Sequence, residues 1–127
     1  MTMGAFSVSL AVQNLEASKT FYETLGFTAM GGAPDQGWLI LKMGDTVLGL
    51  FQGMFEKNML TFNPGWAQDA TPLDDFEDVR DIHARLTAAG VETLQDTGLD
   101  GDDVASFAVV DPDGNPILID QHVPKPG

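Results

Sequence analysis

Apolar and polar residues alternate strictly over residues 6–12. Successive side chains of an extended strand point to opposite faces, so one face of this segment is apolar. The other face carries the small side chains Ser7, Ser9 and Ala11. This pattern is typical of a sheet that packs helices on one face and borders a cavity or solvent on the other.

A helical pattern follows this strand. Apolar residues recur at helical spacing between positions 15 and 25. Asn14 suits the N-cap position, and Gly26 suits the left-handed residue that ends many helices. We then expect a strand led by Phe27, a turn over 31–37, and strands over 38–42 and 46–51. The predicted order of the first half is β-α-β-β-β.

The second half repeats this order. A strand is predicted over 59–63 and a helix from 77 or 78 to 89, ended by Gly90. The remaining predicted elements are a strand over 91–94, a polar loop over 95–103, and strands over 105–110 and 116–121 joined by a turn over 111–115.

Matching positions identify an internal repeat. Gly26 and Gly90 stand 64 positions apart, and the strand segments 48–50 and 117–119 stand 69 apart. The two helices stand further apart in the sequence than the two first strands do. The extra residues form an insertion from 64 to about 75, which contains Trp66. Two copies of a small unit that cannot bury its own sheet are expected to associate. We predict an α+β fold: one domain over 1–127 with two tandem modules, about 5–53 and 58–123, that form a curved mixed sheet.

Composition narrows the possible functions. The chain has 127 residues, 43% of them hydrophobic, with six basic residues against nineteen acidic ones and a net charge of −13. This acidity argues against nucleic acid and anionic membranes as partners, and it either maintains solubility or attracts a cationic small molecule. The sequence contains no cysteine, no secretion signal at its start and no apolar run long enough to span a membrane, so we expect a cytoplasmic location.

Alternation also predicts which residues face a cavity. The face opposite the helices presents small residues, apolar walls and a few hydrogen-bonding groups, as small-molecule pockets usually do. Three aromatic residues stand where loops would edge this pocket and would stack on a planar or cationic ligand. In an alternative interpretation, the face packs against other side chains or a partner chain. The candidate ligand-binding residues are Ser7, Ser9, Trp38, Gly49, Phe51, Phe55, Met59, Thr61, Trp66, Leu118 and Asp120.

Three segments together resemble a known family. LAVQNLEASKTFYETLGF (10–27), DVRDIHARLTAAGV (78–91) and DPDGNPILI (111–119) follow the order and spacing of the vicinal-oxygen-chelate superfamily. That superfamily includes glyoxalase I, extradiol dioxygenases and bleomycin-resistance proteins. The resemblance covers nearly the whole chain. It implies the fold predicted above and a homodimer.

The resemblance also implies where a metal would bind. Enzymes of the family chelate a divalent metal with His, Gln or Glu at four strand positions. These positions map onto Ser7, Gly49, Met59 and Leu118, none of which is a competent ligand for Zn²⁺, Mn²⁺ or Ni²⁺. We therefore expect neither a metal nor another cofactor. An improvised Asp120 and His122 pair is the alternative set of metal ligands, and His83 is expected to lie on the second helix, away from the cavity.

These observations leave three hypotheses about function. The first is a metal-independent protein that binds and sequesters a small organic molecule, either cationic or aromatic. The second is a lyase, isomerase or dioxygenase of the superfamily with a non-standard site; its catalytic residues are unknown, although Asp120, His122 or Tyr22 are candidates for proton transfer. The third is an interaction module whose cavity is filled by its own side chains.

Overall fold

The computed structural model describes residues 2–127. They form two compact units: the Ser7–Met59 unit, and a second unit made of residues 2–6 and Leu60–Gly127, which we call the 60–127 unit. In the part of the chain that is described, neither helix is long and apolar enough to cross a membrane.

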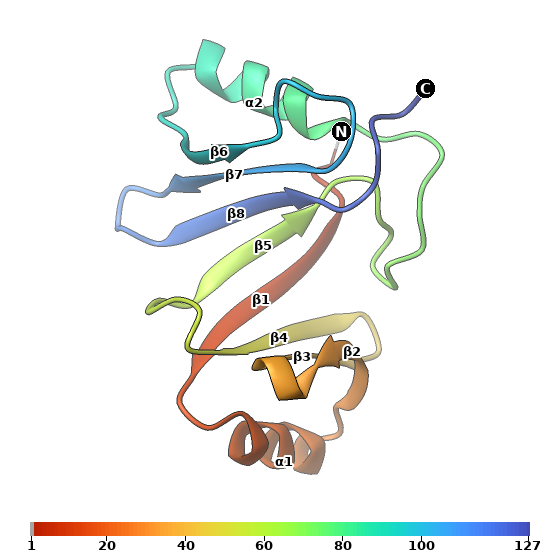
Figure 1. The fold of residues 1–127 in the computed structure, drawn as a ribbon, viewed down its shortest axis with the longest axis vertical. Helices are drawn as coiled ribbons and strands as arrows, with labels where there is room; N and C mark the ends of the chain where they lie inside the picture. Colours follow the sequence, from red (N-terminus) through yellow and green to blue (C-terminus); the bar gives the residue numbers. More distant parts are fainter. Residues whose placement is uncertain (1) are drawn as a thin grey trace. The chain divides into compact units, whose positions relative to one another are not determined.

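The Ser7–Met59 unit contains one module (Figure 1). Its elements are β1 (Ala5–Val12), α1 (Leu15–Leu25), β2 (Thr28–Ala33), a short 3₁₀ turn (Pro34–Gln36), β3 (Trp38–Met43) and β4 (Thr46–Gln52). The strand order is β2-β3-β4-β1, in which β1 runs parallel to β4 and the other pairs are antiparallel. Helix α1 packs on this sheet, where it contacts β4.

The 60–127 unit repeats the same plan. It contains β5 (Met59–Asn63), α2 (Val79–Ala88), β6 (Leu94–Thr97), β7 (Ala105–Val110) and β8 (Pro116–Gln121). The strand order is β5-β8-β7-β6, with β5 parallel to β8 and the other pairs antiparallel. Figure 1 shows α2 along this sheet, where it contacts β7 and β8. The predicted α+β fold of two β-α-β-β-β modules is confirmed.

The hydrophobic cores lie between each helix and its sheet. In the Ser7–Met59 unit, Leu15 and Phe27 pack against Leu39, Leu41 and Leu50, with Leu10, Val12 and Leu48 at the margin. In the 60–127 unit, the core contains Val79, Ile82, Phe107 and Ile119, with Phe62 and Ile117 packed against it. These apolar strand faces agree with the alternation in the sequence. Alternation over 59–63 predicts that Leu60 and Phe62 share the core face, but Leu60 is exposed, so this prediction is wrong for Leu60.

The hydrogen bonds at the helix starts repeat as well. The Asn14 side chain accepts from the N–H of Ala17 at 3.1 Å, and the Asp78 side chain accepts from the N–H of Arg80 at 2.9 Å. A glutamine at the end of each module's last strand also accepts from the first helical N–H: Gln52 from Leu15, and Gln121 from Val79, both at 2.8 Å. The two glutamines stand 69 positions apart, the offset of the strand repeat.

Two predicted boundaries are wrong. The strand expected over 91–94 is Leu94–Thr97, because the N–H groups of Gly90 and Val91 bond back to Thr87 and Leu86 and complete the end of α2. The turn expected over 31–37 begins later, since β2 continues through Ala33. Gly32 allows this: it has a φ of 117°, and a Cβ there would lie 2.7 Å from the Cα of Leu39 on β3.

Candidate functional site

Several predicted site residues lie on the sheet face of the Ser7–Met59 unit that α1 does not cover, which we call the free face; Ser9 and Gly49 on this face are buried. Ser9 pairs with Gly49 across β1 and β4, and Phe51 pairs with Trp38 across β4 and β3. Their neighbours Leu39 and Leu50 point to the opposite face, into the core with α1. Ser7, two residues before Ser9 on β1, shares the free face by parity.

Three aromatic side chains form a row on this face. The Trp38 and Phe51 rings lie parallel, with centroids 6.2 Å apart and an interplanar angle of 4°. Phe55 continues the row, with its centroid 5.3 Å from that of Phe51 and a tilt of 45°. All three side chains are half-buried, so part of their surface remains open to a ligand. We call Trp38, Phe51 and Phe55 the aromatic row.

Gly49 leaves room for this row. A Cβ at position 49 would lie 2.5 Å from Cε2 and 3.2 Å from Cζ of Phe51, and 3.3 Å from Cδ1 of Ile40. The space that a side chain at position 49 would need is therefore filled by the Phe51 ring. The missing side chain and the aromatic row belong to one packing arrangement.

The 60–127 unit carries the remaining predicted residues except Met59, which is the last residue of the Ser7–Met59 unit. Leu118 pairs with Thr61 on β5 and with Ala108 on β7, and Asp120 pairs with Ser106 on β7. Alternate residues of the same strand, including Ile119, point to the α2 side. Thr61 is buried, and Met59 is half-buried at the start of β5.

A second polar and aromatic group lies at the end of β8. His122 Nε2 lies 3.1 Å from Oδ2 of Asp120. The His122 ring stacks on the Trp66 indole, with centroids 4.9 Å apart and planes inclined by 17°. The side-chain amide of Asn63 donates to the backbone carbonyl of Asp120 at 2.8 Å. We call Trp66, Asp120 and His122 the Trp66 cluster.

Asp120 controls the protonation of His122. The hydrogen bond to the Asp120 carboxylate raises the pKa of His122 above its usual value, and partial burial opposes this only in part. The negative charge of Asp120 adds to the rise. The ring is therefore protonated over a wider pH range than a free histidine.

Tyr22, the remaining candidate for proton transfer, and the second histidine, His83, both have structural contacts. Tyr22 packs edge-on against Phe27 with centroids 5.7 Å apart, on the core side of α1. His83 lies on α2, as predicted, where Nε2 is 3.1 Å from both the Thr93 hydroxyl and the Asp96 carboxylate. Neither side chain belongs to the aromatic row or the Trp66 cluster.

A family comparison agrees with these structural features. The model of the Glyoxalase/Bleomycin resistance protein/Dioxygenase superfamily matches residues 4–119. The chain belongs to this superfamily. The match spans both modules and confirms the resemblance carried by the three sequence segments.

Solved structures share the fold of this superfamily member. A superfamily member from Vibrio splendidus 12B01 is 16% identical, with a TM-score of 0.63 over 91% of this chain and 97% of that one. A protein from Legionella pneumophila described as an NAD-dependent benzaldehyde dehydrogenase is 22% identical, with a TM-score of 0.68 over 92% and 98%. An extradiol ring-cleaving dioxygenase from B. fuscum is 19% identical, with a TM-score of 0.59 over 92% of this chain and 32% of that one. No curated protein gave a significant match.

The superfamily's divalent metal does not fit the residues of this chain. The four mapped positions offer the Ser7 hydroxyl, no side chain at Gly49, the Met59 thioether and the Leu118 hydrocarbon. Oxygen and nitrogen ligands of the kind such metals need are missing from three of these positions. Position 49 is also filled by the Phe51 ring. Over residues 2–127, no group of three or more His, Cys, Asp or Glu side chains is arranged to hold a metal.

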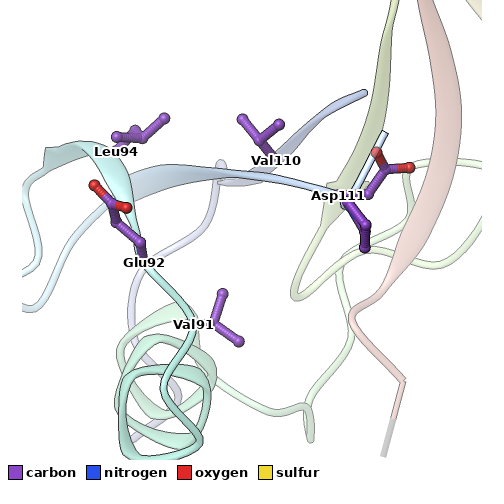
Figure 2. Close-up of a pocket in the computed structure, with 6 residues that line it drawn as sticks. Val91, Glu92, Leu94, Val110 and Asp111 are labelled. Carbon is purple, nitrogen blue, oxygen red and sulfur yellow. The ribbon is translucent and has the colours of Figure 1, made fainter. Parts of the chain in front are cut away.

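An open depression of about 570 Å³ lies elsewhere on the 60–127 unit. Its lining residues are Val91, Glu92, Leu94, Val110, Asp111 and Pro112, none of which was predicted as a site residue. Figure 2 shows Glu92 on the segment after α2 and Asp111 on the turn after β7. The Asp111 carboxylate is already used within its own turn, where it accepts from the N–H groups of Asp113 and Asn115, both at 2.9 Å. This depression therefore offers few polar groups for recognition.

Proposed function

We propose that this superfamily member binds and sequesters a small organic molecule, aromatic or cationic, without a metal. The observation that carries the proposal is the aromatic row on the free face of the Ser7–Met59 sheet. Ser7, Ser9 and Met59 of the same unit are proposed as further lining of this site, and Thr61 and Leu118 are proposed as ligand-binding residues of the 60–127 unit. We further propose that the chain is a single domain with modules over about 5–53 and 58–123. The protein is proposed to form a homodimer and to be located in the cytoplasm.

The aromatic row supplies the attraction that such a ligand needs. Parallel rings expose a flat apolar surface, and one aromatic pair contributes about 0.5–1.5 kcal/mol beyond the burial of its area. A cation over a ring face gains about 0.5–2 kcal/mol, depending on how dry the site is. The net charge of −13 further raises the local concentration of cations.

Binding to the aromatic row can be tested by isothermal titration calorimetry, which does not depend on the fluorescence of Trp38. We predict that flat aromatic cations, such as a naphthylmethyl ammonium, bind more tightly than matched neutral or anionic compounds. Trp38→Ala should weaken binding about tenfold, since it removes one stacking surface. EDTA should have no effect.

Phe21→Ala is the matched control, because Phe21 is an aromatic residue of the same unit that is 60% exposed on α1, outside the aromatic row. This control should bind as the wild type does. Equal affinities of the wild type and Trp38→Ala would refute the proposed site, and metal-dependent binding would refute the proposed metal independence.

The Asp120 and His122 pair supports a second candidate, an enzyme. A histidine that is hydrogen-bonded to a carboxylate and partly exposed has the arrangement of a general base. A lyase, isomerase or dioxygenase activity with a non-standard site would then depend on His122. Turnover of a carbonyl or catechol substrate that is lost in His122→Ala would favour this candidate over sequestration.

A further inference from the structure

The contacts of His122 are those of a bound cation. Its ring stacks on the Trp66 indole and its Nε2 lies 3.1 Å from the Asp120 carboxylate. A flat cation with an N–H group is recognised in proteins by these two features together, an aromatic face and a carboxylate acceptor. We infer that Trp66 and Asp120 form a subsite for a flat organic cation with N–H donors, and that His122 occupies this subsite as an internal, exchangeable ligand.

The backbone of both receptor residues is held in place by contacts that do not involve His122. Asp120 lies within β8, opposite Ser106, and its carbonyl accepts from the Asn63 amide at 2.8 Å. The carbonyl of Trp66 accepts from the N–H of Ala5 at 3.0 Å, and Trp66 also forms an isolated bridge with Pro72. The subsite therefore does not need His122 for its assembly.

His122, in contrast, is free to leave. It follows the last residue of β8, and its side chain is 47% exposed. Its Nδ1 makes no hydrogen bond with any of the described residues, so one contact with Asp120 and one stacking contact hold the ring. A ligand that makes both contacts better can displace it.

Such displacement is linked to protonation. Asp120 supplies the charge that acts on His122, whereas Asn63 from β5, Ser106 from β7 and Trp66 from the 64–75 segment are uncharged. The imidazolium competes with an incoming cation for the Asp120 carboxylate, and the neutral ring competes less. Cation affinity should therefore fall on acidification between the pKa of His122 in the free protein and its lower pKa in the liganded protein, by up to tenfold per pH unit within that interval. This inference rests on the proposed binding of cations by this protein.

Benzamidinium is a suitable probe, because it is flat, donates N–H bonds and keeps its charge between pH 5 and 9. We expect its affinity for the wild type, measured by calorimetry, to fall as the pH is lowered through the His122 titration. His122→Ala should bind the probe more tightly at pH 5 and with little pH dependence, and Asp120→Asn should lose binding at this subsite. Addition of the probe should also lower the pKa of His122 in an NMR titration, because the probe takes its carboxylate partner.

His83→Gln is the matched control, because His83 also pairs with an aspartate at 3.1 Å but lies on α2. It should keep the pH dependence of the wild type. The inference is overturned if Asp120→Asn binds benzamidinium as the wild type does, if the pH dependence survives in His122→Ala, or if the probe does not shift the His122 titration. Each of these outcomes leaves the aromatic row to its own test with Trp38→Ala, so the two failures are distinguishable.

Discussion

At the residue scale, the aromatic row depends on the absence of a side chain at position 49. Gly49 lies where metal-binding relatives are expected to place a ligand, and the Phe51 ring fills the space beside it. The loss of the ligand position and the gain of the aromatic row are thus linked through one glycine. A carboxylate at position 49 would have to displace the ring before it could reach a metal.

Gly49→Ala tests this link. The new methyl group would lie 2.5 Å from the Phe51 ring, so the ring must move out of its parallel arrangement with Trp38. We expect a loss of about 1–3 kcal/mol in the free energy of unfolding, typical of overpacking, and a weaker near-ultraviolet circular dichroism signal from Trp38. Gly31→Ala on β2 is the control, since a Cβ there meets nothing within 4 Å. If both variants unfold at the same urea concentration, the packing argument fails.

At the element scale, cap residues near each helix end allowed the helices to be predicted, whereas contacts between residues far apart in the sequence were not predicted. Asn14 and Gly26 are caps that any helix start or end would favour, and both act as predicted. Gln52 and Gln121 were missed because a polar residue at a strand end resembles an exposed one. The stacking of Trp66 on His122 was missed because the two residues are 56 positions apart in the sequence. Alternation could show that Asp120 and His122 share a face, but it could not show which aromatic residue meets them.

The two glutamines give a matched pair of variants. Gln121 is fully buried and also donates to the Asp78 carboxylate at 2.7 Å, whereas Gln52 is exposed. We expect Gln121→Ala to lower the free energy of unfolding by about 2–3 kcal/mol, because a buried carboxylate loses a hydrogen bond, and Gln52→Ala by about 1 kcal/mol or less. Urea unfolding at neutral pH measures both changes. Equal losses in the free energy of unfolding would show that the buried hydrogen bond between Gln121 and Asp78 does not add to the stability.

The same variant should change the acid stability. Burial opposes ionisation of Asp78, but hydrogen bonds from Gln121 and Arg80 outweigh it and hold the pKa of Asp78 below its usual 3.8. A lowered carboxylate pKa stabilises the fold at pH values above 3.8, and this stability is lost as the pH falls through the folded-state pKa. Gln121→Ala should therefore begin to unfold at a higher pH than the wild type.

At the scale of the whole molecule, the negative charge is unevenly divided. The 60–127 unit has fourteen acidic and three basic residues, a net charge of −11, and the Ser7–Met59 unit has five and three, a net charge of −2. Arg80 and Arg85, two of the three basic residues of the acidic unit, are already paired with Asp78 and Glu77. Most of the remaining acidic side chains of the 60–127 unit therefore repel one another without a compensating cation.

Salt should act on this protein in two opposite ways. Raising NaCl from 0.1 to 1 M shortens the screening length from about 10 to 3 Å, so repulsion within the acidic unit falls and the melting temperature should rise by several degrees. The triple variant Asp100→Asn, Asp102→Asn and Asp103→Asn should show a smaller rise, because it starts with less repulsion. The same salt should weaken the binding of aromatic cations, since it screens the attraction to the net charge. A melting temperature that does not respond to salt would mean that the acidity has little effect on the fold; an affinity that does not respond would mean that stacking alone binds the ligand.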